Sequence, residues 1–411
     1  MFFVASAFNA DGISPPINGG ATNLLPFRKE GDGGYGDRAV KELPEEVLDL
    51  DEKILSYVLR GTDHQDSEGF NLLALRVFGL QVQYIPIYRR YCEKRGVTPK
   101  KISSWNQIPA LPTDAFKVME LAMLPSSAVR TFMTSGTTRP EERGKVHYDE
   151  GGLKLMDATI YEAASSFLFP DKVKTTILII APSPEIVPTM VMAYGMNRLK
   201  EYFGSSRSRF LIGKEGFDTR ILVDELRRSE AEGVPITICG GSFGFVNFFD
   251  TCREKDLRFR PPPGSRILDA GGFKGKSREV KRDEFVNDCE EILGIAKDYC
   301  VNLLGMTEIS SQFYDNTLRN AYKGMSIPKA KINPPWTRTL VVDPDTLEPL
   351  HPGKIGLLRH FDLANRGHIL AIQTDDLGRT TPEGFEIYGR IREGEARGCS
   401  LTIDEMTQIR T

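Results

Sequence analysis

Cysteine and histidine are both scarce in this sequence, and neither shows the spacing of a metal site. The 411 residues include six cysteines and five histidines, and no two cysteines have the C-x-x-C spacing of zinc or dithiol motifs. Scattered thiols in a chain of this length argue against a disulfide framework. We therefore expect reduced cysteines and a cytoplasmic protein, and we exclude a small disulfide-stabilised domain or a structural zinc module.

An excess of basic charge and a long apolar run are absent as well. Lys and Arg total 53 against 56 Asp and Glu, a formal net charge of -3, so the chain lacks the basic footprint of a nucleic-acid-binding protein. No apolar run approaches the roughly 20 residues that span a bilayer, and the apolar start of the chain lacks the basic n-region of a signal peptide. We expect neither a nucleic-acid partner nor a membrane span.

Strand and helix patterns alternate through most of the chain, which predicts an α/β fold. β-branched runs such as 175–181 (TTILIIA) alternate with amphipathic stretches such as 218–232, the arrangement of mostly parallel sheets covered by helices. Residues 69–95 predict one helical region with an apolar and aromatic stripe. After Pro334 the strands are short and joined by turns, which predicts a smaller β-rich subdomain.

These patterns divide the chain into three parts. Residues 1–40 are rich in Gly, Pro, Asn and Ser without periodicity, and we expect a loosely ordered extension there. Residues 41–388 are predicted to form the large domain, with its β-rich part at about 336–388. Residues 389–411 are predicted to be a hinge remnant and a tail.

A run of hydroxyl residues around one glycine follows an expected strand at 129–133. Main-chain N–H groups and hydroxyls of such a loop hold the β- and γ-phosphates of a nucleotide, and glycine allows close approach. The run lacks the Lys-Ser/Thr ending of a P-loop, and a plain polar turn is the alternative interpretation. It consists of Thr134, Ser135, Gly136, Thr137 and Thr138.

Two motifs after later strands add a candidate base site and a candidate metal site. Gly271 and Gly272 follow the strand RILDA and let a flat base approach the main chain; a tight strand–helix turn is the alternative. Thr307 would donate to the α-phosphate, and Glu308 would coordinate Mg²⁺. For this pair the alternative is an ordinary helix start.

The last two motifs offer groups for the ribose. Asp376 follows a strand, where its carboxylate would accept from both ribose hydroxyls, with an ordinary turn as the alternative. Arg390 would reach the ribose or a phosphate oxygen, with a surface arginine as the alternative. Each motif alone is weak. Together and in this order they indicate an enzyme that activates a carboxylic acid with ATP.

In order and chemistry these motifs resemble the large domain of the ANL adenylate-forming superfamily. Three stretches more closely resemble acyl-protein synthetases of the LuxE type: 108–117 (IPALPTDAFK), 269–274 (DAGGFK) and 397–401 (RGCSL). The resemblance implies that a fatty acid and ATP form an acyl-adenylate, and that the acyl group passes to a cysteine as a thioester and onward to a partner acyl reductase. It favours Cys399 as the acceptor, because Arg397 favours thiolate; an incidental tail cysteine is the alternative.

The chain departs from the superfamily pattern at four places. Residues 139–142 (RPEE) follow the hydroxyl run where Gly-x-Pro-Lys is usual, so Arg139 or Lys145 is expected to supply the cation. Leu304 stands where the superfamily often has an aromatic residue, and Asp375 stands where it often has a glycine. Asp376 is therefore the residue that matches the ribose-binding aspartate of the superfamily. Few residues follow Arg392, so the mobile carboxy-terminal domain with its catalytic lysine is expected to be absent.

One apolar segment is a candidate lining for the acyl chain. Its members are Gly241, Ser242, Phe243 and Phe245, and hydrophobic core is the alternative interpretation. The substrate is also open at this point. An aryl or other small acid, with or without transfer to coenzyme A, is the alternative to a long-chain fatty acid.

The same segment supports a rival function. Residues 240–244 match G-x-S-x-G between an expected strand and helix, the pattern of a nucleophile elbow. This makes a serine esterase or acyltransferase at Ser242 an alternative, with a base among His351, His360 and His368. It leaves the hydroxyl run and the Thr-Glu pair without a role.

Overall fold

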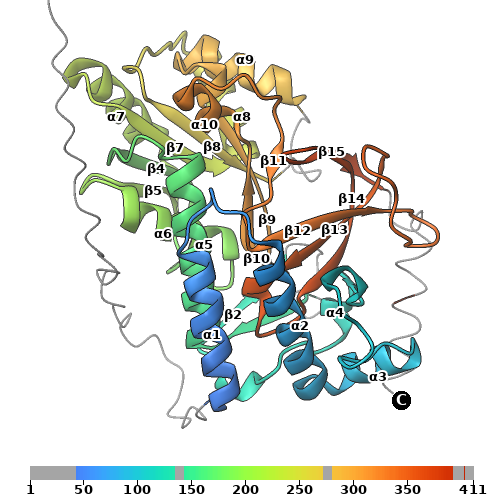
Figure 1. Ribbon diagram of the computed structural model, residues 1–411. Coiled ribbons are helices and arrows are strands. Elements are labelled where there is room, and N and C mark those ends of the chain that lie inside the picture. The colour runs from blue at the N-terminus through green and yellow to red at the C-terminus, as the bar shows by residue number, and fades with distance from the viewer. Residues whose placement is uncertain (1–42, 135–142, 272–279, 392–401, 403–411) are drawn as a thin grey trace, which may run out of the picture. The chain divides into compact units, whose positions relative to one another are not determined.

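The computed structural model describes residues 43–134, 143–271, 280–391 and 402. All of them belong to one unit, which spans residues 41–411. Two sheets, a short ribbon and their covering helices make up this unit (Figure 1), so the α/β class is confirmed. The division into extension, large domain and tail stays a prediction.

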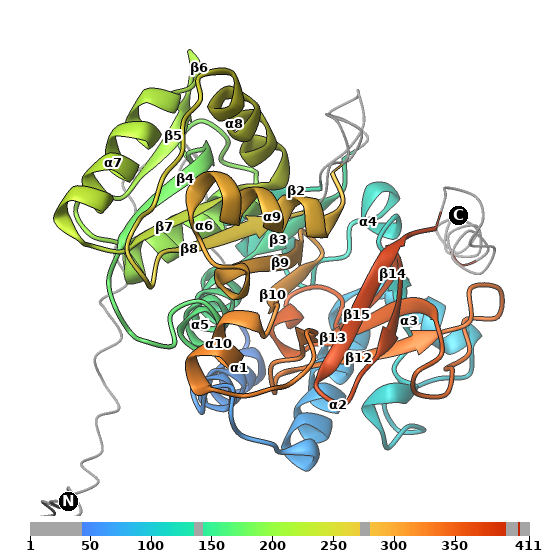
Figure 2. The same cartoon turned by 90° about the horizontal axis from the view of Figure 1, so that it is seen from above.

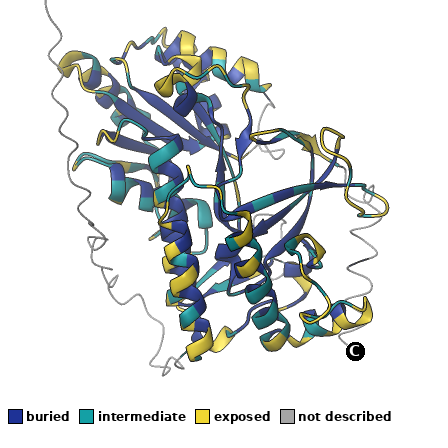
Figure 3. Ribbon diagram, in the orientation of Figure 1, coloured by how far each residue is buried: buried dark blue, intermediate teal, exposed yellow. Residues whose placement is uncertain are grey.

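The first sheet is mostly parallel and carries the alternation of strands and helices seen in the sequence. Its strand order is β10-β9-β8-β7-β4-β5-β6, and its inner pairs are parallel. The central strands are buried (Figure 3), which explains their continuous apolar runs. The strands are β4 (Thr176–Pro182), β5 (Arg209–Gly213), β6 (Gly216–Phe217), β7 (Ile236–Gly241), β8 (Arg266–Ala270), β9 (Cys300–Met306) and β10 (Ile309–Tyr314). The helices that follow or precede them are α5 (Glu150–Phe167), α6 (Val191–Phe203), α7 (Thr219–Glu232), α8 (Ser242–Glu254), α9 (Arg282–Leu293) and α10 (Thr317–Lys323).

The second sheet is mainly antiparallel and lies in the β-rich part of the chain. Its order is β11-β15-β14-β13-β12, and one strand from much earlier in the sequence, β1, pairs in parallel with β14. The strands are β1 (Leu111–Pro112), β11 (Lys331–Ile332), β12 (Thr337–Val342), β13 (Gly356–Asp362), β14 (Ala371–Thr380) and β15 (Gly384–Arg390). A two-stranded ribbon is formed by β2 (Arg130–Met133) and β3 (Lys145–Tyr148).

The early part of the unit is helical, as predicted for residues 69–95, but the sequence did not predict the break at Ile85. The chain forms α2 (Ser67–Tyr84) and α3 (Pro86–Lys94), bent by 109°. Ile85 is extended before Pro86, because proline disfavours the helical conformation of the residue before it. The remaining helices are α1 (Glu45–Val58), α4 (Ala115–Val118) and the short 3₁₀ turns η1 (Trp105–Gln107), η2 (Pro125–Ser127), η4 (Lys297–Tyr299) and η5 (Leu363–Asn365).

In the part of the chain that the structure describes, no single helix has the length and apolar character to cross a membrane. The bent pair of α2 and α3 meets that test only when the two helices are taken together.

A buried ion cluster connects the early helices to the loop before β14. Arg366 is fully buried, and its guanidinium donates to Asp51 of α1 at 2.5 and 2.7 Å and to Asp149 at 2.7 and 2.8 Å. Asp149 also caps α5 through Gly152 N–H. Burial raises the pKa of Asp51 to about 6, so the arginine offsets the cost of a carboxylate that is out of water.

Replacing Arg366 is expected to destabilise the protein strongly. Arg366→Met leaves two buried carboxylates without their cation, which costs about 3–5 kcal/mol of unfolding free energy. The control is Arg379→Met, since Arg379 pairs with Glu386 at a side-chain exposure of 45%, and such pairs contribute about 0–1 kcal/mol. Urea unfolding of both variants at pH 7 measures the difference. Equal losses would contradict the role given to the buried cluster.

Candidate functional site

The β2–β3 ribbon carries the beginning of the hydroxyl run at its tip. Thr134 is buried, and it exchanges two hydrogen bonds with Gly144: its N–H donates to Gly144 O and its hydroxyl accepts from Gly144 N–H, both at 2.9 Å. Arg143 Nε donates to Thr134 O at 2.7 Å. The two ends of the loop are therefore closed on each other as a stem. Ser135, Gly136, Thr137 and Thr138 lie outside the described residues, as does Arg139.

The Thr307–Glu308 pair lies beside this stem. It forms the turn between β9 and β10, where Met306 is paired with Ile309, so the helix-start interpretation is wrong. Both residues are buried, and the Thr307 hydroxyl donates to Met133 O at 3.4 Å. The turn thus places a hydroxyl and a carboxylate next to the end of β2, from which the hydroxyl run continues.

Asp376 and Arg390 are opposite each other on β14 and β15. Arg390 Nε donates to Asp376 Oδ1 at 2.7 Å, while the Asp376 side chain is only 7% exposed. The second oxygen, Oδ2, is buried and has no hydrogen-bond partner among the described residues. Buried carboxylate oxygens are normally satisfied, so this oxygen is available to a ligand donor such as a ribose hydroxyl.

Asp375 differs from its neighbour in environment. Burial raises the pKa of the Asp375 carboxyl, and Asp114 adds to that rise, whereas Arg390 and Lys117 oppose it. Its main-chain oxygen accepts from Ile391 N–H at 3.0 Å. The structure therefore pairs Asp376 directly with the arginine and gives Asp375 no such partner among the hydrogen bonds found for the described residues.

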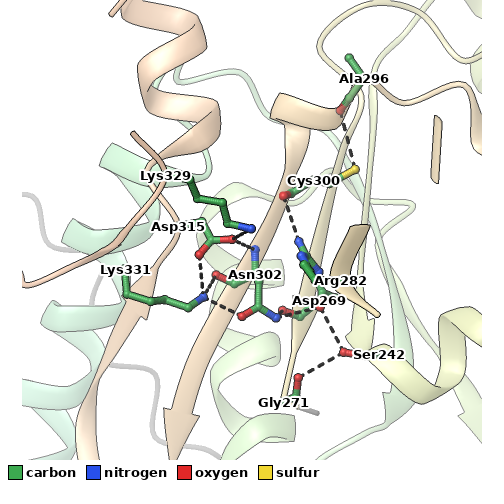
Figure 4. A network of polar contacts seen from close by, with 10 residues as sticks. All are labelled: Ser242, Asp269, Gly271, Arg282, Ala296, Cys300, Asn302, Asp315, Lys329 and Lys331. Carbon is green, nitrogen blue, oxygen red and sulfur yellow. Dashed lines mark hydrogen bonds and ion pairs between the residues drawn. The ribbon is translucent and has the colours of Figure 1, made fainter. Parts of the chain in front are cut away.

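A polar network holds the main chain at Gly271, the first glycine after β8 (Figure 4). Gly271 has φ +77°, a conformation that favours glycine. The Ser242 hydroxyl lies 3.2 Å from Gly271 O and 3.1 Å from Asp269 Oδ2, which act as its acceptors. Asp269 also accepts from Arg282 at 2.5 Å and from Asn302 Nδ2 at 2.8 Å. Gly272 lies outside the described residues.

The same network continues to the second sheet. Lys331 of β11 donates to Asn302 O and Oδ1 at 2.6 Å and pairs with Asp315 at 2.9 Å. Burial lowers the pKa of Lys331. Although burial opposes it, Lys331 and Lys329 hold the pKa of Asp315 below its ordinary value. Sequence reasoning missed these supports; the available signal was the charged Asp269 directly after the apolar residues Ile267 and Leu268 of a buried strand.

The predicted acyl-pocket residues have different surroundings. Gly241 ends β7 and Ser242 begins α8, and Phe243 is 38% exposed. Phe245 is fully buried and packs on Phe249 and Phe285, with ring centroids 6.2 and 5.6 Å apart. Phe245 is therefore a residue of the hydrophobic core. A pocket role for Gly241, Ser242 and Phe243 stays a prediction.

The serine-hydrolase alternative lacks its base in the described residues. Ser242 does lie between a strand and a helix, but its hydroxyl faces a carboxylate and a carbonyl, and no hydrogen bond found there joins it to a histidine. His360 packs between Phe313 and Phe385, and burial lowers its pKa to about 3. His368 is buried against Tyr148. The geometry gives Ser242 a supporting role instead.

Comparison with known proteins identifies similar chains. A sequence model of the family described as "Acyl-protein synthetase, LuxE" matches residues 43–407. Two curated relatives are named long-chain-fatty-acid–luciferin-component ligase. The one from Vibrio harveyi is 22% identical over 328 residues, covering 77% of this chain and 82% of its own. The one from Aliivibrio fischeri is 21% identical over 346 residues, covering 78% and 84%.

Solved structures show the same fold at low sequence identity. An open conformation of 2-hydroxyisobutyryl-CoA ligase with 2-HIB-AMP and CoA has a TM-score of 0.60 and 13% identity, covering 81% of this chain and 77% of that one. The same enzyme in its thioesterification state has a TM-score of 0.57 and 14% identity, covering 89% and 74%. The chain therefore shares the fold of this ligase.

Proposed function

The chain belongs to the LuxE family of acyl-protein synthetases, and we propose that it activates a long-chain fatty acid with ATP and passes the acyl group to a cysteine thiol. Membership makes it an adenylate-forming ligase that uses ATP and a carboxylic acid. We infer that the acid has a long hydrocarbon chain from the names of the two curated relatives, which are both long-chain-fatty-acid ligases. The observation that carries the proposal is the buried, half-satisfied Asp376 carboxylate beside Arg390.

The first step joins the acid to AMP. A carboxylate oxygen forms a bond to the α-phosphorus of ATP as the bond to pyrophosphate breaks, and the protein has to hold these atoms in line. Asp376 would accept from the ribose hydroxyls, and Thr307 would donate to the α-phosphate. The hydroxyl run, which continues from the stem at Thr134, would bind the other two phosphates, and Gly271 would lie against the base.

Mg²⁺ is proposed to accompany the nucleotide at Glu308. This ion commonly uses one or two carboxylates together with substrate phosphates and keeps several waters. A single buried carboxylate in the turn beside Met133, the last residue of β2, fits that requirement. The described residues contain no cluster of three His, Cys, Asp or Glu side chains for an all-protein site. When bound, the ion would neutralise charge on the leaving pyrophosphate.

The second step transfers the acyl group. The sulfur of the Cys399 thiolate is proposed to attack the acyl carbon, a thioester forms, and AMP leaves with its phosphate oxygen; the thiol proton is lost to solvent. Cys399 lies outside the described residues. A partner acyl reductase is the proposed next acceptor. The cysteines that the structure describes are free, which supports a reducing, cytoplasmic location.

Carboxylate-dependent ATP–pyrophosphate exchange tests the proposal. The full chain would be incubated with ATP, Mg²⁺ and labelled pyrophosphate, with each acid of a panel from acetate to palmitate and benzoate. Exchange is expected to be fastest with long-chain acids. A preference for benzoate or acetate would overturn the fatty-acid substrate, and no exchange with any acid would overturn adenylation.

A further inference from the structure

A segment from Leu111 to Glu120, called the strap below, connects two parts of the candidate site. Its start is tied to the ribose side. Pro112 in β1 is opposite Gln373 in β14, and Thr113 N–H donates to Gln373 O at 3.1 Å. The same strand continues from Gln373 to the aspartate pair at 375–376. The strap therefore begins next to the strand that presents the proposed ribose carboxylate.

The other end of the strap is tied to the phosphate side. A Cβ added at Gly144 would come within 2.9 Å of the Phe116 main chain, so α4 lies directly against the stem that Gly144 closes on Thr134. Two residues beyond α4, the Glu120 carboxylate is 3.5 Å from His147 Nε2 on β3. Figure 2 shows α4 between the ribbon and the second sheet. The strap thus spans from the ribose side to the stem formed by Thr134 and Gly144.

The strap contains one lysine, Lys117, which lies in α4. Lys117 Nζ is 2.5 Å from Asp114 Oδ1, with side-chain exposures of 37% and 42%. Both residues act electrostatically on Asp375, as Arg390 does. The Lys117 ammonium therefore acts on Asp375 from a segment whose first strand pairs with β14, and at 37% exposure it can exchange partners with solvent.

We propose that Lys117 is a substrate-contacting residue, whose ammonium leaves Asp114 to bind the phosphates of ATP during adenylation. The inference rests on the proposed function. A lysine provides a compact charge on a flexible stem, which suits a phosphate whose charge shifts during transfer. Two other cations are described at the stem: Arg143 already donates to the main-chain oxygens of Thr134 and Met133, and Lys145 is opposite Met133 on β3. The strap adds Lys117 to these cations from a separate segment of the chain.

Ligand binding separates this role from a structural one. The full-length Lys117→Ala variant is expected to bind ATP about 10-fold or more weakly, because it loses a charge-assisted contact, and to bind adenosine as the wild type does. Exchange supported by a long-chain acid should fall about 100-fold in kcat, the scale for removal of a transition-state donor. Lys117→Arg should recover part of the rate, and Lys117→Met should recover none.

The control is Lys53→Ala, because Lys53 forms a similar short-range pair with Asp49 on α1 at 52% exposure. Its exchange rate is expected to match the wild type, and both alanine variants should melt within about 2 °C of it. Equal losses of ATP and adenosine affinity would overturn the phosphate contact, as would a wild-type exchange rate in Lys117→Ala. Absence of exchange in the wild type would instead refute the proposed function itself.

Discussion

Asp376→Asn is expected to lower kcat/KM for ATP about 100-fold in the exchange reaction, whereas Asp375→Asn should stay within a few-fold of the wild type. Asp376 has two oxygens, of which one accepts from Arg390 at 2.7 Å and the other is buried without a partner in the described residues. Asparagine places an NH2 donor at one of these two oxygen positions, so it can no longer accept at both of them, from Arg390 and from a ribose hydroxyl. Hydrogen bonds to charged groups contribute about 1.5–3 kcal/mol, and roughly 2.7 kcal/mol corresponds to 100-fold.

Asp375→Asn is the matched control because it changes the same group one residue earlier. The Asp375 carboxyl is half-buried, and burial raises its pKa. Loss of its negative charge should therefore change ATP binding little. Exchange kinetics over a range of ATP concentrations, together with thermal melting, measure both variants. A larger loss at Asp375 than at Asp376 would reverse the assignment of the ribose carboxylate. A large drop in melting temperature for Asp376→Asn would make its kinetic loss a stability effect.

The sequence predicted the regular elements well, because local patterns carry that information. Strands such as β4 and β7 are buried on both faces, so their side chains form apolar runs that are recognisable without any partner. The resemblance to the superfamily selected Asp376 over Asp375 for the ribose, and this choice stays a prediction. The hairpin register is consistent with it, since Asp376 is opposite Arg390.

Contacts between distant segments were not predictable in the same way. The strand β1 has two residues, too few for a period-2 pattern, and its partner in β14 is far along the chain. The partners of Arg366 are also remote in sequence, with Asp51 separated by 315 residues. β10 was not among the predicted strands, and the Thr-Glu pair before it is typical of a helix start. Its pairing with β9 makes this segment a strand instead of a helix.

The network below Gly271 gives Ser242 contacts that its motif did not predict. Sequence reasoning gave Ser242 to an acyl pocket or to nucleophilic catalysis. The structure gives its hydroxyl two acceptors, Asp269 and Gly271, and anchors Asp269 through Arg282 and Asn302. A hydroxyl held in this way fixes the main chain where the base is proposed to bind.

Cys399→Ser is expected to abolish the acyl-enzyme completely while it leaves ATP–pyrophosphate exchange at the wild-type rate. The thiolate is the nucleophilic form of cysteine, whereas a serine hydroxyl stays protonated at neutral pH and is a much weaker nucleophile. The surroundings of the other five cysteines argue against them as the acyl acceptor. All five are buried, and burial raises the pKa of Cys92 and Cys239 to about 12 and that of Cys252 to about 11.

The measurement is incorporation of a labelled long-chain fatty acid in the presence of ATP, followed by denaturing electrophoresis with and without neutral hydroxylamine, which cleaves thioesters. Wild-type protein should carry hydroxylamine-sensitive label, and Cys399→Ser should carry none. Cys252→Ser is the matched control and should label like the wild type, because its thiol is buried in the core. Full labelling of Cys399→Ser would contradict the assignment. If neither protein is labelled but added coenzyme A yields acyl-CoA, the acceptor is a free thiol, and the two proposed steps separate: adenylation stands, and protein acylation does not.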